Sequence, residues 1–217
     1  KGWGLSVPSW LGRLVMEAPS PLVVSILFLV SRAAQTPTTL AFLLMWLAHY
    51  VHRAFIYPFE RRNHGNRMPV VVMLMGSIFN LGNAYLNGRY LFYFSPERYP
   101  AAWFKDARFI GGACLFVGGY ILNRWADRKL RALRQPGESG YKIPYGGFYR
   151  WISCPNYLGE MMEWSGWALA TWSLPGLTFA VWTYANLAPR AVTNHTWYRN
   201  HFADYPTERK AFIPGVW

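Results

Sequence analysis

The stretch from residue 153 to residue 173, SCPNYLGEMMEWSGWALATWS, constrains the fold most, because it is apolar enough to span a bilayer and yet carries two carboxylates. Proline is tolerated in the first turn of a helix, so a helix is predicted from Pro155 onward. One face of that helix carries a polar stripe formed by Asn156, Glu160, Glu163 and Trp167. Ionisable groups at membrane depth face a protein interior or a wet cavity, which favours a functional site. The alternative is a structural hydrogen bond to a neighbouring helix.

Composition places the chain in the membrane class. Of its 217 residues, 53% are hydrophobic and 15% are charged, which leaves few side chains to form the surface of a soluble domain. The net charge of +12 comes without a recognisable nucleic-acid module, so no nucleic-acid partner is expected. Lipid headgroups or a phosphate-bearing ligand are the expected anionic partners. The two cysteines indicate neither a disulfide framework nor a zinc site, and no metal is expected.

Six apolar runs predict six membrane spans, at residues 20–32, 38–57, 69–94, 107–124, 155–172 and 175–190. Only SLPG separates the last two, which predicts a tight antiparallel hairpin. With both chain ends on one side, that side receives 16 of the 22 Lys and Arg residues and the other side 4, so the positive-rich side is predicted to be cytoplasmic. The expected fold is an all-α integral membrane bundle of about six spans, a single domain over residues 1–217. Its cytosolic loops and amphipathic tail are expected to cap a cofactor site.

The first two spans carry polar candidates near their ends. Glu17 is a lone acid in LVMEAPSP, just before the first apolar run, where it can also serve to cap the next helix. In HYVHRAFIY, the side chains of His49, Arg53 and Tyr57 share one helical face. A tyrosine at the end of a span is also typical of an interface anchor, so both interpretations of Tyr57 stay open.

The third and fourth predicted spans carry residues that favour contact with other helices. Asn80, Asn83 and Asn87 lie on one side of the third span, and asparagines in lipid need partners, so this side is predicted to face other helices or a cavity. The fourth span pairs glycines at 111 and 112 and again at 118 and 119, which favours close helix packing. No GxGxxG follows a strand, so the sequence offers no dinucleotide-binding βαβ unit.

The fourth span is predicted to continue as a helix out of the membrane, through NRWADRKLRALRQPGE. Its polar stripe consists of Asn123, Asp127, Arg131 and Arg134. Two arginines one turn apart suit a phosphate, and the carboxylate can accept hydrogen bonds from ribose hydroxyls. An ordinary solvated helix face with i,i+4 ion pairs is the alternative.

The tail after the sixth span is amphipathic. One helical side of it carries Arg190, Asn194, Tyr198 and His201. Polar side chains that leave a membrane helix in this way can bind the charged end of a cytosolic ligand. A helix lying on the membrane surface is the alternative.

Three long runs of the chain resemble the steroid 5α-reductase family, in the family's order: NYLGEMMEWSGWALATWSLP follows QPGESGYKIPYGG and precedes HFADYPTERKAFIP. HYVHRAFIYP and EAPS are similar to that family's segments at the corresponding places. The resemblance covers nearly all of the chain. It implies a multi-helix membrane enzyme, with a seventh span upstream of Lys1, that uses NADPH to reduce the 4,5 double bond of a 3-oxo-4-ene steroid.

The resemblance also implies roles for the matching residues. Glu17 and Tyr57 are expected to bind the C3 carbonyl of the steroid. The residues that match cofactor contacts are Asn123, Asp127, Arg134, Tyr141, Asn156, Glu160, Arg190, Asn194 and Tyr198, with Arg131 as a neighbour. Two positions depart from the family pattern: Asn194 stands where a histidine is common, and Met75 stands where a relative has a basic residue.

The residue types agree with this chemistry. A conjugated ketone is reduced at its β-carbon when the negative charge that develops on the carbonyl oxygen is stabilised, and a tyrosine hydroxyl can do this. Glu17 can orient the phenol or hold a proton itself. Asn156 and Glu160 are expected to hold the nicotinamide amide. The steroid or other lipid substrate is expected to enter from the bilayer of a bacterial inner membrane or the endoplasmic reticulum. The cofactor is expected to enter from the cytoplasm, and the protein is expected to be a monomer.

Other functions stay open at this point. An isoprenylcysteine-type methyltransferase would use S-adenosylmethionine and would need no site for a 2′-phosphate, so a preference for NADPH over NADH separates it from a reductase. A sterol-binding membrane protein without enzymatic activity would form no cofactor-dependent product. Within the reductases, an enoyl-thioester or a polyprenol lipid is an alternative substrate.

Overall fold

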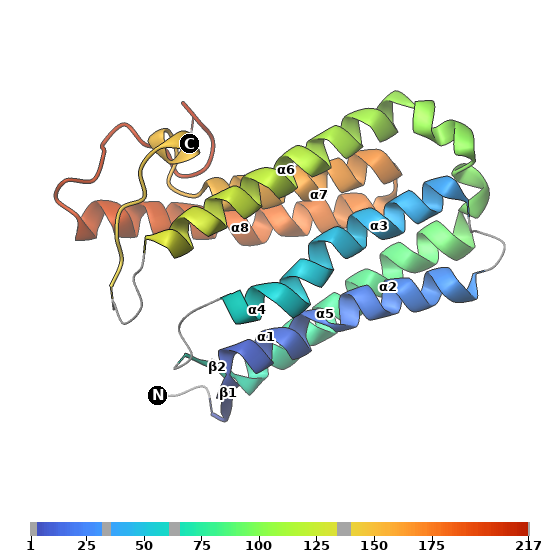
Figure 1. The fold of residues 1–217 in the computed structure, drawn as a ribbon, viewed down its shortest axis with the longest axis horizontal. Helices are drawn as coiled ribbons and strands as arrows, with labels where there is room; N and C mark the ends of the chain where they lie inside the picture. Colours follow the sequence, from blue (N-terminus) through green and yellow to red (C-terminus); the bar gives the residue numbers. More distant parts are fainter. Residues whose placement is uncertain (1–3, 32–35, 61–65, 134–139, 217) are drawn as a thin grey trace. The chain divides into compact units, whose positions relative to one another are not determined.

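The computed structural model of the chain describes residues 4–31, 36–60, 66–133 and 140–216 (Figure 1). The chain divides into two compact units, Lys1–Asp106 and Ala107–Trp217. Helices dominate both units, in agreement with the all-α expectation. The single domain over residues 1–217 stays a prediction, and each unit is described here by itself.

The first unit opens with a short hairpin and a helical stretch. Strand β1 (Ser6–Pro8) pairs antiparallel with β2 (Arg67–Pro69), with Val7 opposite Met68. Helices α1 (Ser9–Glu17) and α2 (Pro19–Val30) follow β1 and are joined at Ala18, which has helical φ and ψ. The helical stretch that contains the predicted first span, residues 20–32, therefore begins earlier, at Ser9. Proline is tolerated in the first turn of a helix, so Pro19 starts α2 without breaking the stretch.

The second helical stretch runs from Pro37 to Glu60. It comprises α3 (Pro37–Val51), the π-helical turn η2 (His52–Ile56) and α4 (Tyr57–Glu60). Thr36 caps α3, because its side chain accepts from the backbone N–H of Thr39 while the Thr39 hydroxyl accepts from the backbone N–H of Thr36.

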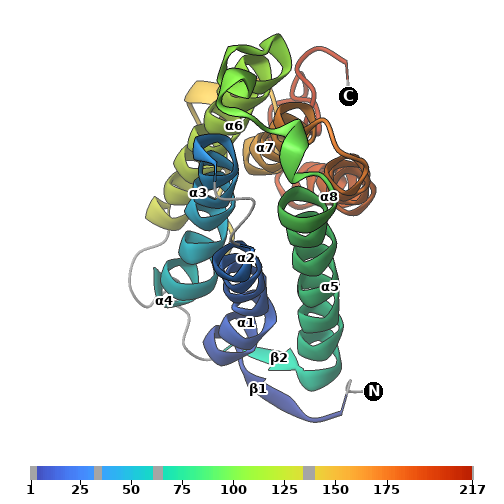
Figure 2. The same ribbon diagram turned by 90° about the vertical axis from the view of Figure 1, so that its right-hand side faces the viewer.

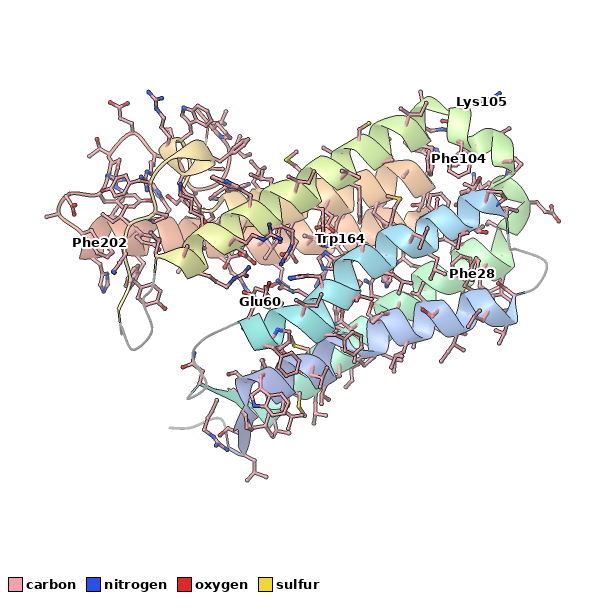
Figure 3. The ribbon with its side chains drawn as sticks, viewed as in Figure 1. Phe28, Glu60, Phe104, Lys105, Trp164 and Phe202 are labelled. Carbon is pink, nitrogen blue, oxygen red and sulfur yellow. The ribbon has the colours of Figure 1, made fainter. Side chains whose placement is uncertain are left out.

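The third helical stretch is α5 (Val70–Arg89), which continues as the π-helical turn η3 (Tyr90–Phe94). Two short 3-10 turns, η4 (Pro96–Arg98) and η5 (Ala101–Lys105), complete the first unit. Lys105 and Phe104 of η5 are labelled in Figure 3.

Within the first unit, α1 and α2 pack against α5 and also against the stretch from α3 to α4 (Figure 2). Glycines on α5 permit the close approach. A Cβ at Gly88 would lie 2.7 Å from the Leu27 side chain of α2, and a Cβ at Gly76 would collide with Met16 of α1. Phe28 of α2 (Figure 3) meets Phe92 edge to face, with ring centroids 5.3 Å apart.

The second unit is built on three long helices, α6 (Ala107–Ala132), α7 (Pro155–Thr171) and α8 (Leu174–His201), with a short 3-10 turn, η6 (Gly147–Arg150), before α7. In Figure 1 these helices run alongside one another. Helix α7 begins at Pro155, as predicted. Helix α6 continues as far as Ala132, which confirms that the polar stripe after residue 122 is helical over its described part.

Glycines spaced by seven residues bring α6 and α7 into backbone contact. A Cβ at Gly112 would lie 2.6 Å from the Gly166 carbonyl oxygen, and a Cβ at Gly119 would lie 2.5 Å from that of Gly159. The opposing glycines would clash in the same way. By contrast, a Cβ at Gly118 would meet no atom within 4 Å. The predicted close packing is therefore confirmed for one glycine of each pair.

Helices α7 and α8 form the predicted tight hairpin. Trp172 lies in the left-handed region, with φ 45° and ψ 46°, and ends α7. The Ser173 side chain accepts a hydrogen bond from the backbone N–H of Gly176 and begins α8. Helix α8 then passes through Pro189 to His201, beyond the predicted end of the sixth span at residue 190, and Phe202 follows its last turn (Figure 3). The polar tail residues 190–201 therefore lie on the same helix as that span.

Three helical stretches of the described residues are long and apolar enough to cross a membrane: Ser9–Val30, Pro37–Glu60 and Val70–Phe94. All three belong to the first unit. The three spans predicted for the second unit lie on α6, α7 and α8, of which α6 and α8 run beyond the predicted spans. These helices are less apolar, because they carry more polar side chains. The structure is therefore consistent with a helical membrane protein, and the count of about six spans stays a prediction.

Candidate functional site

Glu17, at the end of α1, is buried in the first unit with 8% exposure. Asn80 of α5 donates from Nδ2 to the Met16 carbonyl oxygen at 2.9 Å and to Glu17 Oε2 at 3.3 Å. Arg53 places its Nε 3.6 Å from Glu17 Oε1. A carboxylate buried in an apolar helical environment needs such partners, which here come from two different helical stretches.

Tyr57, the second predicted catalytic residue, begins α4 and is half-buried. The guanidinium carbon of Arg53 lies 5.2 Å from the centre of its ring, and that of Arg13 lies 5.7 Å away. Because Arg53 contacts both Glu17 and Tyr57, the structure joins the two predicted residues through this arginine. We call Glu17, Arg53, Tyr57 and Asn80 the carboxylate cluster.

A π-helical turn sits within this cluster. His52–Ile56 forms the turn η2, directly before Tyr57. His52 Nε2 lies 3.3 Å from Oε2 of Glu60, at the end of α4 (Figure 3). Single π turns within helices are frequent at functional sites, and they change the direction of the side chains that follow. The turn therefore helps to determine where Tyr57 points.

A second phenol, that of Tyr50, lies in α3, just before the π-helical turn. Its ring stacks on Trp46, with centroids 5.1 Å apart, and it is 3% exposed. Trp46 donates from Nε1 to the Ser20 hydroxyl at 3.0 Å, and Ser20 comes three residues after Glu17. Sequence reasoning did not single out Tyr50, although it lies three residues before Arg53 and seven before Tyr57.

In the second unit, predicted cofactor residues of α6 and α7 are hydrogen-bonded to one another. Asn123 donates from Nδ2 to the carbonyl oxygen of Asn156 at 2.9 Å, and Asn156 donates from Nδ2 to Asp127 Oδ1 at 3.2 Å. Asn123 and Asp127 are 8% and 7% exposed. The start of α7 is thus fixed to one turn of α6 by three of the residues that sequence analysis selected.

The remaining candidates on these helices differ in exposure. Glu163 is fully buried where the backbones of α6 and α7 are in contact, beside Gly119, which favours the structural interpretation of this residue. Glu160 and Arg131 are half-buried. Arg134 lies outside the described residues.

Predicted cofactor residues also gather around the last turns of α8. Asn194 donates from Nδ2 to the Tyr157 hydroxyl of α7 at 3.4 Å. Tyr198 lies one turn further along α8, and the ring of Tyr141 meets that of Trp197, with centroids 4.7 Å apart. Arg190, one turn before Asn194, is exposed.

The C-terminal segment lies against the start of α7. Lys210 donates from its backbone N–H to the Trp151 carbonyl oxygen at 2.9 Å, and Cys154 donates to that of Ala211 at 3.0 Å. The Arg209 guanidinium lies 5.0 Å from the ring of Tyr145 and 5.1 Å from that of Tyr205, and the residue is 3% exposed. This segment was recognised in the sequence only through the family resemblance.

Cys154 is not suited to nucleophilic chemistry. Burial raises the pKa of its thiol to about 12, so the thiol is protonated at neutral pH. A reactive cysteine needs a lowered pKa and access to solvent. Among the residues that the structure describes, no group of three or more His, Cys, Asp or Glu side chains is arranged to hold a metal ion.

A cavity of about 490 Å³ lies between α7 and α8 near their connecting turn. Apolar side chains line most of it, including Leu169, Trp172 and Leu177. It lies at the opposite end of α7 from Asn156, so it does not coincide with the predicted cofactor residues.

Apolar helices long enough to cross a bilayer, a buried carboxylate cluster and a second set of hydrogen-bonded polar residues are together consistent with a helical membrane enzyme. Comparison with known proteins gives the family. The model of the family described as 3-oxo-5-alpha-steroid 4-dehydrogenase matches residues 66–217. The chain belongs to this family of integral membrane oxidoreductases, which use a nicotinamide cofactor.

Similar proteins come from plants and mammals. The steroid 5-alpha-reductase DET2 of Solanum lycopersicum is 46% identical over 216 residues, which cover 97% of this chain and 82% of that protein. The 3-oxo-5-alpha-steroid 4-dehydrogenase 2 of Sus scrofa is 42% identical over 213 residues, with coverage of 98% and 82%. The 3-oxo-5-alpha-steroid 4-dehydrogenase 1 of Homo sapiens is 41% identical over 213 residues, with coverage of 97% and 81%. The resemblance inferred from the motifs is thus confirmed.

Proposed function

We propose that this protein reduces the 4,5 double bond of 3-oxo-4-ene steroids to give 5α-3-oxosteroids, with NADPH as the reductant. The observation that carries the proposal is the carboxylate cluster, in which Arg53 joins buried Glu17 to the ring of Tyr57. Family membership supports the reaction class, and the names of the similar proteins support a steroid as the substrate.

The proposed role of the cluster is to stabilise charge on the C3 oxygen of the steroid. Hydride addition at C5 moves an electron pair onto that oxygen, and the enolate is then protonated at C4 to restore the carbonyl. Tyr57 donates a hydrogen bond to the C3 oxygen. Arg53 orients the phenol, because a guanidinium over an aromatic face fixes the ring, while Glu17 and Asn80 hold Arg53 in place.

The donor set of the second unit fits a nicotinamide dinucleotide. Such a cofactor supplies a hydride when bound. Asn156 and Glu160 are proposed to hold its carboxamide, Asn123 and Asp127 its ribose, and Arg131 and Arg134 its phosphates, including the 2′-phosphate that distinguishes NADPH from NADH. The hydrogen bonds among Asn123, Asn156 and Asp127 support this group, because they preorganise amide and carboxylate groups on two helices. Tyr141, Arg190, Asn194 and Tyr198 complete the proposed set.

The proposed setting is a bacterial inner membrane or the endoplasmic reticulum, with the cofactor residues on the cytoplasmic side. The distribution of Lys and Arg supports this orientation. The steroid is proposed to enter from the bilayer, and the protein is proposed to act as a monomer.

Replacement of Tyr57 by phenylalanine tests the proposed mechanism. Y57F keeps the aromatic ring for Arg53 and removes the donor, so turnover should fall by about a hundredfold or more, with NADPH binding unchanged. Y50F is the matched variant, because Tyr50 belongs to the same helical stretch and is more deeply buried. Turnover and NADPH affinity are to be measured for both in detergent. Near-normal turnover of Y57F contradicts the role of Tyr57, and a large loss in Y50F alone assigns the donor to Tyr50.

A further inference from the structure

Three polar groups converge on the hydroxyl of Ser153, which is 5% exposed and lies two residues before α7. His195 Nδ1 of α8 and the Tyr205 hydroxyl each lie 2.6 Å from Ser153 Oγ. The carbonyl oxygen of Lys210 lies 3.2 Å from it. We call Ser153, His195, Tyr205 and Lys210 the Ser153 cluster. This cluster joins the start of α7, the last turns of α8 and the C-terminal segment.

One assignment of protons satisfies all three contacts. A carbonyl oxygen only accepts, so the single proton of the Ser153 hydroxyl goes to Lys210. The serine oxygen then accepts from both of its other neighbours. In this assignment the Tyr205 hydroxyl is one donor, and His195 carries its proton on Nδ1 to be the other.

The cluster lies next to residues proposed to bind the cofactor. Asn156 lies in the first turn of α7, three residues after Ser153. His195 directly follows Asn194 on α8. The ring of Tyr205 stacks on that of Tyr198, with centroids 5.4 Å apart and an interplanar angle of 20°.

The backbone supports the same arrangement. Ser153 donates from its N–H to the Lys210 carbonyl oxygen at 2.8 Å, so Lys210 accepts from both the backbone and the side chain of one residue. On its other side the ring of Tyr205 meets the guanidinium of Arg209 at 5.1 Å. Tyr205 is therefore held on two sides, and its hydroxyl has a defined direction toward Ser153.

We propose that Ser153, His195 and Tyr205 are positioning residues for the nicotinamide cofactor, which set the placement of Asn194 and Tyr198 on α8 against Asn156 at the start of α7. This inference rests on the proposed function of those three residues. It assigns no contact with the cofactor to the cluster itself. Loss of a cluster hydrogen bond weakens cofactor binding, because the residues that bind the cofactor are no longer held at the right distance.

Substitutions at His195 separate this role from simple packing. H195N keeps a donor near the place of Nδ1, H195Q places its amide near the position of Nε2, and H195A has no donor. The dissociation constant for NADPH, the KM of the steroid and kcat at saturating NADPH are to be measured for the purified full-length protein. H195A and H195Q should raise the NADPH dissociation constant by about three- to tenfold, the size expected for one hydrogen bond. H195N should stay within about twofold, and kcat at saturation should change little in all three.

Y205F and S153A extend the test if a His195 variant fails to fold. Y205F removes one donor and keeps the ring stack, so it should raise the same dissociation constant by a similar factor. An unchanged NADPH dissociation constant in H195A, S153A and Y205F, or an H195N variant as weak as H195A, would overturn the inference. If the unaltered protein does not bind NADPH, both the proposed cofactor and this inference are wrong. If the unaltered protein and every variant bind NADPH equally well, only the inference about the Ser153 cluster is wrong.

Discussion

At the scale of single residues, Arg53 has the most demanding position in the first unit. It is the shared neighbour of a buried carboxylate and of a phenol, and it lies within a π-helical turn. An arginine can do both because its guanidinium forms hydrogen bonds in its plane and stacks on aromatic rings through its face. Lysine offers only a compact charge, so the two residues are not equivalent here.

Replacement of Arg53 therefore should impair the chemical step. We expect R53M to lower kcat/KM for the steroid on the order of a hundredfold, because both Glu17 and Tyr57 lose the group that orients them. R53K should be intermediate. R89M is the matched control, since Arg89 also stacks on aromatic rings, 4.3 Å from the Tyr93 ring, at a place with no proposed role in the reaction. Equal activity of R53M and R89M in a steady-state assay contradicts the proposed role of Arg53.

His195 gives a second prediction at this scale. Burial lowers its pKa from the usual 6.5, and nearby Arg199 and Lys210 add to the effect. Because the unfolded chain then binds this proton more readily, the free energy of unfolding should rise with pH up to about 6.5 and fall as pH drops below that value. The thermal midpoint in detergent, compared between the natural protein and H195N from about pH 5 to pH 7, isolates this contribution. A pH dependence that is the same in both proteins would show that His195 does not supply it.

At the scale of helices, the second unit depends on the glycine contacts between α6 and α7. Gly112 and Gly119 face Gly166 and Gly159 with no room for a methyl group. Without a hydrophobic driving force between helices in lipid, such close backbone packing is a main source of association. This packing also fixes the position of Asn156 along the helix axis relative to Asn123 and Asp127. The proposed cofactor site depends on that position.

Adjacent glycines on α6 provide a matched test of this packing. G119A should destabilise the protein by about 1–3 kcal/mol, because its methyl group would press on the backbone of α7. G118A should be neutral or slightly stabilising, since its methyl group meets no atom and alanine favours the helix by about 0.5–1 kcal/mol. Thermal unfolding followed by circular dichroism in detergent measures both. A G119A protein as stable as G118A is incompatible with the described interface.

The sequence predicted those features of the helices that depend on local pattern. Three features were predictable because each follows from a residue type at a fixed spacing: the start of α7 at Pro155, the SLPG hairpin and the glycine packing. The sequence predicted only the span at residues 20–32 and not the helix α1 that precedes it, which continues into α2 through Ala18. The sequence predicted the sixth span to end at residue 190 and an amphipathic helical tail after it, and the structure joins both in α8, which passes through Pro189. Long apolar helices tolerate a proline when neighbouring groups compensate for the missing hydrogen bond.

The site was less accessible to sequence reasoning. Glu17 and Tyr57 were selected, but Arg53 and Asn80 were noted only for their helical faces, and Tyr50 was not noted. Contacts such as the one between Asn80 and Glu17 join residues 63 positions apart, which no local periodicity encodes. The Ser153 cluster joins residues up to 57 positions apart and was missed for the same reason.

At the scale of the whole molecule, the chain combines an apolar unit with a unit that is richer in polar side chains. The first unit contains the stretches apolar enough to cross a bilayer, together with the carboxylate cluster. The second unit holds the amides, carboxylates and tyrosines proposed to bind a dinucleotide. A lipid-soluble substrate and a charged cofactor need different environments, and one protein must provide both to pass a hydride between them.

Product analysis tests the central claim most directly. The purified protein is to be incubated with testosterone or progesterone and with NADPH that carries deuterium at the transferable position of the nicotinamide. The account predicts a 5α-3-oxosteroid with one deuterium at C5, formed with NADPH and much more slowly with NADH. No reduced steroid, or a reduced steroid without deuterium at C5, would contradict the proposed reaction.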